Sequence, residues 1–169
     1  MTRQRGPASS KIWRPTALVI ESYLVPDVLL FDAGVLGQVS HPRRNPAFAQ
    51  WFDQLLTTET TVMIPEISDY EVRRELIRAQ RKVGIGRLDQ LKQALPYLPI
   101  TTAVMLRAAQ LWAEARQRGR PTADPKELDC DVILAAQARE VGATVVTDNI
   151  GHLSLFVEAK SWRDIRVAE

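Results

Sequence analysis

Isolated acidic and amide side chains recur in this sequence where an apolar run ends or a helical pattern begins. They come from four separate segments, at residues 32, 71, 129–131 and 148–149. The set is Asp32, Glu71, Asp129, Asp131, Asp148 and Asn149. Carboxylates gathered without a basic partner repel one another, so their pKa values must rise unless a cation neutralises them. Hard oxygen ligands of this kind suit Mg²⁺ or Mn²⁺.

Each of these acids also has a structural alternative. Asp32 precedes Ala-Gly and suits a turn, and Ser68-x-x-Glu71 has the pattern of a capping box at a helix start. Asp129 suits an N-cap and Asp131 the first turn of a helix, where negative charge is favoured. In an ideal helix, positions 129 and 131 point ~200° apart, so the two cannot share a face. We therefore expect Asp131 to be the metal ligand and Asp129 the cap or an auxiliary acid.

Basic side chains near these acids suggest contacts with phosphate. Arg43 and Arg44 lie in the loop HPRRNP and are candidate substrate-binding residues, together with Thr147 at the end of the run ATVVT. Phosphate contacts would position a nucleic-acid strand without reading its sequence. A second basic cluster crowds one expected helix, where a solvated face is an equal alternative. It consists of Arg73, Arg74, Arg78, Arg81 and Lys82.

Other reactive or aromatic side chains are expected to be structural. Cys130 lies between two acids but is predicted to be a core residue, and His152 to pack rather than bind substrate. The three tryptophans at positions 51, 112 and 162 sit in apolar patterns and are predicted to be core residues rather than stacking platforms for bases.

Short β-rich runs alternate with helical patterns along the chain. Strands are expected at 28–31, 61–67 and 143–147, a short strand or link at 98–101, and an edge strand at 165–167. Helices are expected at 46–57, 68–82, 86–95, 102–119 and 130–142, with a polar loop at 120–129. This alternation predicts a single α/β domain whose mostly parallel sheet is flanked by helices in three α/β/α layers. Ligands bind such sheets outside the carboxyl ends of the strands, where the acids fall.

Length and composition limit the class of protein. The 169 residues suffice for one domain with a core, and no apolar run approaches the ~20 residues of a membrane span. One cysteine excludes an internal disulfide. With no apolar segment after the basic N-terminus we read no secretory signal, and we expect a cytoplasmic protein without membrane contact.

The net charge of +2 is unevenly distributed. Residues 1–14 carry four of the 22 basic side chains and no acid, which leaves the remainder near −2. Such a basic tail could hold a polyanion, or be a solvated, partly disordered extension or the product of a start codon placed too early. We treat residues 1–25 as an N-terminal extension and residues 26–169 as the folded domain.

The segments LLFDAGVLGQ (29–38), EISDYEVRREL (66–76) and LDCDVILAAQAREVGATVVTDNIGHL (128–153), in this order, resemble a PIN domain, the nuclease fold of VapC-type toxins. The resemblance covers about residues 27–167. It implies a PIN-like α/β/α fold and RNA cleavage that depends on Mg²⁺ or Mn²⁺. It makes Asp32, Glu71 and Asp131 the first three acids of the site, and Thr147-Asp148-Asn149 the motif that carries the fourth.

At the fourth position this chain departs from the family pattern, because Asn149 stands where an Asp is usual. A neutral amide oxygen binds a metal ion more weakly than a carboxylate does. Consecutive residues at a strand end usually point apart, so we expect Asn149 to face the metals and Asp148 to lie at the rim.

The favoured function is a metal-dependent endoribonuclease that hydrolyses RNA phosphodiester bonds, with Asp32, Glu71, Asp131 and Asn149 as catalytic residues. The resemblance allows it to be the toxin of a toxin–antitoxin pair, with a small antitoxin protein and a homodimer among its partners. The main alternative is a catalytically weak or inactive PIN-fold module that binds RNA or protein. A phosphate-accepting signalling domain with Asp32 as acceptor fits poorly, because Asp27 and Lys160 are misplaced for its other groups.

Overall fold

A parallel sheet of five strands forms the centre of the molecule. The computed structural model describes residues 28–118 and 125–167. The strands are β1 (Val28–Phe31), β2 (Thr61–Pro65), β3 (Tyr97–Leu98), β4 (Thr144–Val146) and β5 (Ala159–Lys160), in the order β3-β2-β1-β4-β5. Every pair of neighbours is parallel, so all carboxyl ends meet at one edge. The predicted parallel sheet is confirmed.

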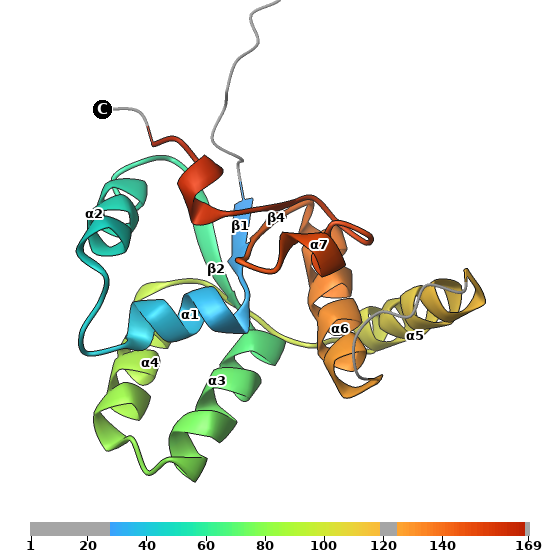
Figure 1. Cartoon of the computed structure of the whole chain (residues 1–169), viewed down its shortest axis with the longest axis horizontal. Coiled ribbons are helices and arrows are strands. Elements are labelled where there is room, and N and C mark those ends of the chain that lie inside the picture. The colour runs from blue at the N-terminus through green and yellow to red at the C-terminus, as the bar shows by residue number, and fades with distance from the viewer. Residues whose placement is uncertain (1–27, 119–124, 168–169) are drawn as a thin grey trace, which may run out of the picture.

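Helices cover both faces of this sheet. They are α1 (Ala33–Ser40), α2 (Pro46–Leu55), α3 (Glu66–Arg78), α4 (Lys82–Ala94), α5 (Thr102–Gln117), α6 (Pro125–Val141), α7 (Ile150–Leu153) and the 3-10 turn η1 (Trp162–Asp164). Residues of β1 alternate between two cores: Leu29 and Phe31 pack with α1 and α2, while Leu30 packs with α6. Figure 1 shows α1 and α2 on one side of β1, and α6 on the other. The α/β/α layering is confirmed.

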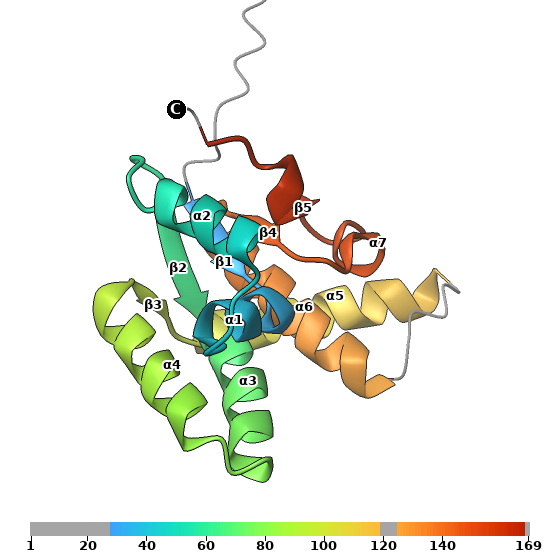
Figure 2. The ribbon, with the colours of Figure 1, turned by 60° about the vertical axis from the view of Figure 1, so that its left-hand side comes forward.

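Two helix pairs extend from this layered core. The helices α3 and α4 form a hairpin that projects away from the sheet (Figures 1 and 2). On the other side α5 packs along α6 through a third apolar cluster, which includes Leu111, Leu128 and Ala135. None of the helices within the described part of the chain has the length and apolarity that a membrane crossing requires.

Several helix boundaries differ from the sequence-based expectations, and three helix starts bear on the site. Helix α1 was not expected, although Asp32 followed by Val35, Leu36 and Val39 has the spacing of an N-cap and an apolar face. Helix α3 begins at Glu66 rather than at residue 68. Helix α6 begins at Pro125 inside the expected polar loop, because proline suits the first turn of a helix.

These boundaries correct three of the structural alternatives. Ser68 lies inside the first turn of α3, and its buried Oγ has no hydrogen-bond partner in the described residues, so the capping-box interpretation of Glu71 is wrong. Asp129 lies within α6, so it is not the N-cap. Asp32 is the N-cap of α1 rather than a turn residue.

Smaller differences concern the C-terminal segment and the tryptophans. The edge strand is β5 at Ala159–Lys160, and residues 165–167 form no strand. Trp51 and Trp162 are core residues as predicted. The prediction for Trp112 is wrong, because 38% of its surface is exposed and Arg116 stacks on its ring. The expected N-terminal extension, residues 1–25, lies outside the described residues.

A buried carboxylate fastens the α3–α4 hairpin to the sheet. The carboxylate of Asp69 accepts hydrogen bonds from Arg73 at 3.0 Å, Lys92 at 2.9 Å and the Tyr97 hydroxyl at 3.2 Å. Burial alone raises the pKa of Asp69, but the hydrogen bonds from Lys92 and Arg73 outweigh it and hold the pKa below its usual value. The pairs therefore stabilise the fold most when Asp69 is ionised.

We expect Asp69→Asn to lower the free energy of unfolding by about 2 kcal/mol at pH 7, because the half-exposed Arg73 and Lys92 lose charged hydrogen bonds to a buried carboxylate. A lowered pKa means that the wild-type advantage is present above the unfolded-state pKa and disappears as the pH falls through the folded-state pKa. Urea unfolding at pH 7 and at pH 3 measures both effects. Asp89→Asn, which removes the exposed partner of Arg73, is the control and should change the stability by less than about 1 kcal/mol. Equal losses for both variants would contradict this assignment.

Candidate active site at the carboxyl edge of the sheet

Asp32 lies at the centre of the carboxyl edge, directly after β1. Its Oδ1 accepts a hydrogen bond from the Val35 backbone N–H at 2.7 Å, which caps α1. Its Oδ2 accepts a hydrogen bond from the Thr147 hydroxyl at 2.5 Å, across from the end of β4. The Thr147 hydroxyl oxygen also accepts from the Asn149 backbone N–H at 2.8 Å. Thr147 is buried and so acts here as a support for Asp32.

The surroundings of Asp32 disfavour its negative charge. Burial raises the pKa of Asp32, and the charge of Asp148 raises it further, against the lowering effect of the hydrogen bonds from Thr147 and Val35. Asp148 is thus a near neighbour of Asp32 across the β1–β4 boundary. A carboxylate in this state favours a bound cation or a proton.

Glu71, on α3 after β2, is the second carboxylate of this kind. Burial raises the pKa of Glu71 and the charge of Asp32 adds to the effect, while a hydrogen bond with the Cys130 thiol and the charge of Arg74 oppose it. The Arg74 guanidinium lies 3.6 Å from the Glu71 carboxylate. Glu71 and Asp32 therefore act on one another electrostatically, and Arg74 offsets part of their repulsion.

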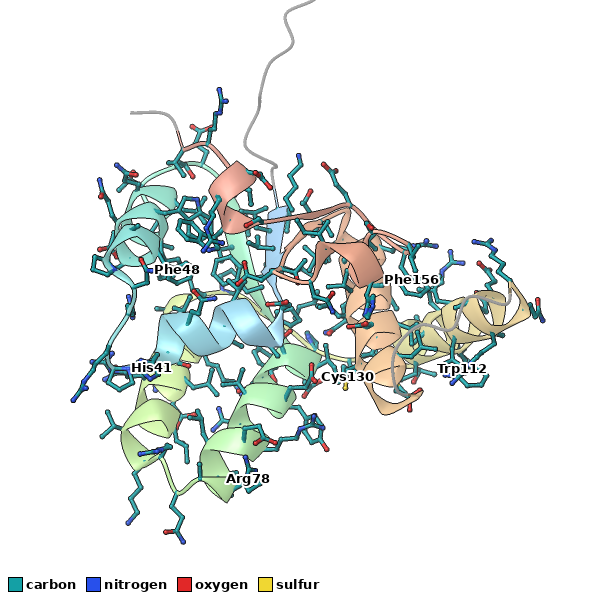
Figure 3. All side chains as sticks on the ribbon, viewed as in Figure 1. His41, Phe48, Arg78, Trp112, Cys130 and Phe156 are labelled. Atoms are coloured by element: carbon teal, nitrogen blue, oxygen red, sulfur yellow. The ribbon has the colours of Figure 1, made fainter. Side chains whose placement is uncertain are left out.

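Cys130 connects α6 to Glu71. Burial raises the pKa of the Cys130 thiol to about 12, and the neighbouring Glu71 and Asp131 carboxylates contribute. The thiol thus stays protonated and can donate to Glu71. Figure 3 shows Cys130 between α3 and α6. The prediction that Cys130 belongs to the core is confirmed in part: it is half-buried and packs on an apolar cluster, but it also serves the acidic site.

At the end of β4 the two neighbouring polar residues have different partners. The Asp148 carboxylate accepts from the Gln38 amide at 3.1 Å and lies 3.4 Å from the Arg163 guanidinium. The Asn149 amide lies 3.4 Å from the His152 ring. His152 thus contacts a site residue while lying half-buried in α7.

The expected site residues are not all equally close. Asp148 and Thr147 each act on Asp32, Asp32 acts on Glu71, and Cys130 lies between Glu71 and Asp131. Asp129 is exposed on α6. Arg43 is exposed at the wall of a cavity of about 1230 Å³ between α1 and the α3–α4 hairpin, which also reaches Glu71. Arg44 lies apart, with its guanidinium 5.9 Å from the centre of the Phe52 ring.

The donor set suits a small hard cation. Within the described residues no three acidic, histidine or cysteine side chains form a group that could hold a metal ion by itself. Mg²⁺ keeps several waters and is commonly bound through only one or two carboxylates. Asp32 and Glu71 could supply two, since each ionised oxygen has a further lone pair beyond the hydrogen bond it accepts. A bound cation would lower both raised pKa values, because it stabilises the ionised carboxylates.

The family model of the PIN domain matches residues 29–154. This chain belongs to the PIN domain family. The match includes Asp32, Glu71, Asp131 and the Thr147-Asp148-Asn149 motif, so the resemblance predicted from the three sequence segments is confirmed. Among curated protein sequences, none matches this chain.

Solved structures of similar fold include VapBC and FitAB proteins and a VapC toxin. VapBC2 from Rickettsia felis, bound to a DNA fragment from its promoter, has a TM-score of 0.67 at 17% identity, covering 80% of this chain and 98% of that chain. FitAcB from Neisseria gonorrhoeae has a TM-score of 0.62 at 22% identity, covering 80% and 98%. VapC20 from Mycobacterium tuberculosis, a toxin that cleaves the sarcin-ricin loop, has a TM-score of 0.55 at 14% identity, covering 77% and 97%. At these identities the likeness shows the PIN fold.

Sequence reasoning missed three side chains of this site. Gln38 binds Asp148, but the helix that carries it was not expected. Arg163 reaches Asp148 from η1, and no local pattern marks that contact. Arg74 was noted only as one of five clustered basic residues. Its position three residues after Glu71 was the available signal, because such pairs are neighbours on a helix.

We expect Asp32→Asn to keep or raise the melting temperature in metal-free buffer, whereas Asp32→Ala should lower the stability by about 1 kcal/mol. Asn retains an oxygen to cap α1 without the desolvated charge, and Ala removes the cap. Because the folded-state pKa of Asp32 is raised, wild-type stability falls as the pH rises through the interval above the unfolded-state pKa. The difference in melting temperature between Asp32→Asn and the wild type should therefore increase from acidic to neutral pH. A difference that decreases over this interval would contradict the raised pKa.

Proposed function

We propose that this protein is a metal-dependent endoribonuclease that hydrolyses phosphodiester bonds in RNA. The observation that carries the proposal is the pair Asp32 and Glu71: two largely buried carboxylates with raised pKa values that affect one another at the carboxyl edge of a PIN fold. Keeping such charges together disfavours folding, so their presence suggests a role in binding cations.

The proposed Mg²⁺ or Mn²⁺ ligands are Asp32, Glu71 and Asp131, with Asn149, Asp148 and Asp129 as further or auxiliary groups. A divalent ion in such a site lowers the pKa of a bound water and neutralises charge that develops on phosphoryl oxygens. Thr147 holds the Asp32 carboxylate by a hydrogen bond, and the Val35 N–H fixes its second oxygen. The Cys130 thiol donates to Glu71, and the charge of Arg74, 3.6 Å away, stabilises its ionised form. These contacts orient the acids before any ligand binds.

The substrate and partners follow from fold and charge. Arg43 at the cavity beside Glu71 is a proposed contact for RNA, whereas Arg44 is the weaker candidate because its guanidinium lies over Phe52. The VapBC and FitAB complexes support a small antitoxin protein as partner and a role as the toxin of such a pair. We also propose a cytoplasmic location and allow for a homodimer.

We expect Asp131→Asn to lose nearly all Mn²⁺-dependent RNA cleavage while its melting temperature stays equal or rises slightly, because repulsion among the acids falls. The assay follows cleavage of a mixed-sequence RNA with Mn²⁺ and with EDTA. Asp53→Asn, an exposed acid on α2, is the matched control and should cleave like wild type. Wild-type cleavage by Asp131→Asn removes this residue from the site. RNA binding without cleavage by the wild type favours the alternative of a catalytically inactive binding module.

The fourth ligand position has its own test. Asn149→Asp should tighten Mn²⁺ binding, because it adds a charge to the site, and Asp148→Ala should change it modestly if Asp148 lies at the rim. Isothermal titration of Mn²⁺ into both variants, followed by cleavage rates at saturating Mn²⁺, separates the two. Loss of cleavage in Asp148→Ala together with unchanged Mn²⁺ affinity in Asn149→Asp would reverse the two roles.

A further inference from the structure

Two exposed arginines flank the acids of the carboxyl edge. Arg74 lies on α3, which follows β2, and Arg163 lies in η1, which follows β5. Between them come Asp32 after β1 and Asp148 after β4, in the strand order β2-β1-β4-β5. Along this edge the charges therefore alternate from cation to acids and back to cation.

Arg163 is held in place by its own neighbours. Its guanidinium lies 4.4 Å from the centre of the Trp162 ring and 3.4 Å from the Asp148 carboxylate. Trp162 is buried against Phe48 and Trp51, with ring centres 5.4 and 5.8 Å away. The side chain of Arg163 itself is 61% exposed. A fixed aromatic surface thus presents a solvent-facing guanidinium beside the acidic site.

Arg74 repeats this arrangement on the other side. Its guanidinium lies 5.3 Å from the centre of the Tyr70 ring and 3.6 Å from the Glu71 carboxylate, and its side chain is 48% exposed. The Arg74–Glu71 distance of 3.6 Å and the Arg163–Asp148 distance of 3.4 Å are long for hydrogen-bonded ion pairs. Each guanidinium therefore keeps donors that another anion can use, since Arg has five N–H groups in a planar fork.

Other arginines of α3 are engaged differently. Arg73 donates to both Asp69 and Asp89 in the pairs that fasten the hairpin. Arg78 forms a close pair with Glu75 at 2.7 Å, and Figure 3 places it near the far end of α3, away from Cys130. Only Arg74 among these three adjoins an acid of the site.

We propose that Arg74 and Arg163 bind the phosphates on either side of the bond that is cleaved, so that a single RNA strand crosses the acids from one arginine to the other. The strands that precede their anchoring acids, β2 and β4, are two spacings or about 10 Å apart, and Glu71 lies a further turn along α3, six residues after β2 ends. One phosphate group is too small to meet both guanidiniums across that gap, so the arrangement suits a continuing strand rather than a mononucleotide. The inference rests on the proposed nuclease function.

The test measures binding of a fluorescein-labelled single-stranded RNA by fluorescence anisotropy. Its length of about 12 nucleotides lies within the range of site sizes of proteins that bind single strands. Ca²⁺ replaces Mn²⁺ to offset the acidic charge, and a gel verifies that the strand stays intact. The variants are Arg74→Ala, Arg163→Ala and their double. Arg78→Ala is the matched control for Arg74, because it also removes an arginine paired with a glutamate three residues earlier. Arg107→Ala on α5 controls for the loss of one charge elsewhere.

Each single variant should bind about three- to fivefold more weakly, and the double about tenfold or more, because distant sites act independently. The slope of log affinity against log salt should fall by about 0.7 for each arginine removed. The controls should stay close to wild type, and Mn²⁺ titration should show that metal affinity is not weakened in either arginine variant.

Unchanged RNA binding in both Arg74→Ala and Arg163→Ala, with a wild type that binds and cleaves, overturns the inference and leaves the nuclease function standing. Equal weakening in Arg78→Ala and Arg107→Ala also overturns it, since the effect would then follow net charge. A wild type that neither binds RNA nor cleaves it with Mn²⁺ overturns the proposed function itself, and this inference with it.

Discussion

The fixed position of the Asp32 carboxylate is the constraint on which the site depends. One oxygen caps α1 and the other accepts from Thr147, so the same side chain joins the helix after β1 to the end of β4. Two hydrogen bonds and the positive end of α1 partly offset the unfavourable burial of its charge. The central acid is therefore oriented by the fold itself, and the neighbouring strands bring the remaining acids to it.

This arrangement brings negative charges close together, and their repulsion is offset by arginines on either side of Asp32 rather than next to it. The charge of Asp148 raises the pKa of Asp32, and the charge of Asp32 raises the pKa of Glu71. Their counter-charges, Arg163 and Arg74, are exposed and lie more than 3 Å away, where water and salt weaken them. The repulsion around Asp32 is therefore only partly offset, and its pKa stays raised.

The sequence predicted the sheet and the location of the acids because both depend on local patterns. Apolar β-rich runs fixed β1, β2 and β4, and parallel strands must collect their carboxyl ends at one edge. Helix starts were less predictable: α6 begins within a polar stretch, so the role expected of Asp129 as a cap was wrong. The contacts of Cys130 with Glu71 and of Arg163 with Asp148 join distant segments, and no spacing in a single sequence encodes such pairs.

The partners of Asp148 bear on what an amide at position 149 changes. The charge of Asp148 raises the pKa of Asp32, while the Asp148 carboxylate itself contacts Gln38 and Arg163. A second carboxylate at position 149 would add negative charge next to Asp148, whose own charge already raises the pKa of Asp32. An amide at position 149 avoids that added charge and still offers a carbonyl oxygen. In this chain the extra negative charge stands one residue earlier, where an arginine can offset it.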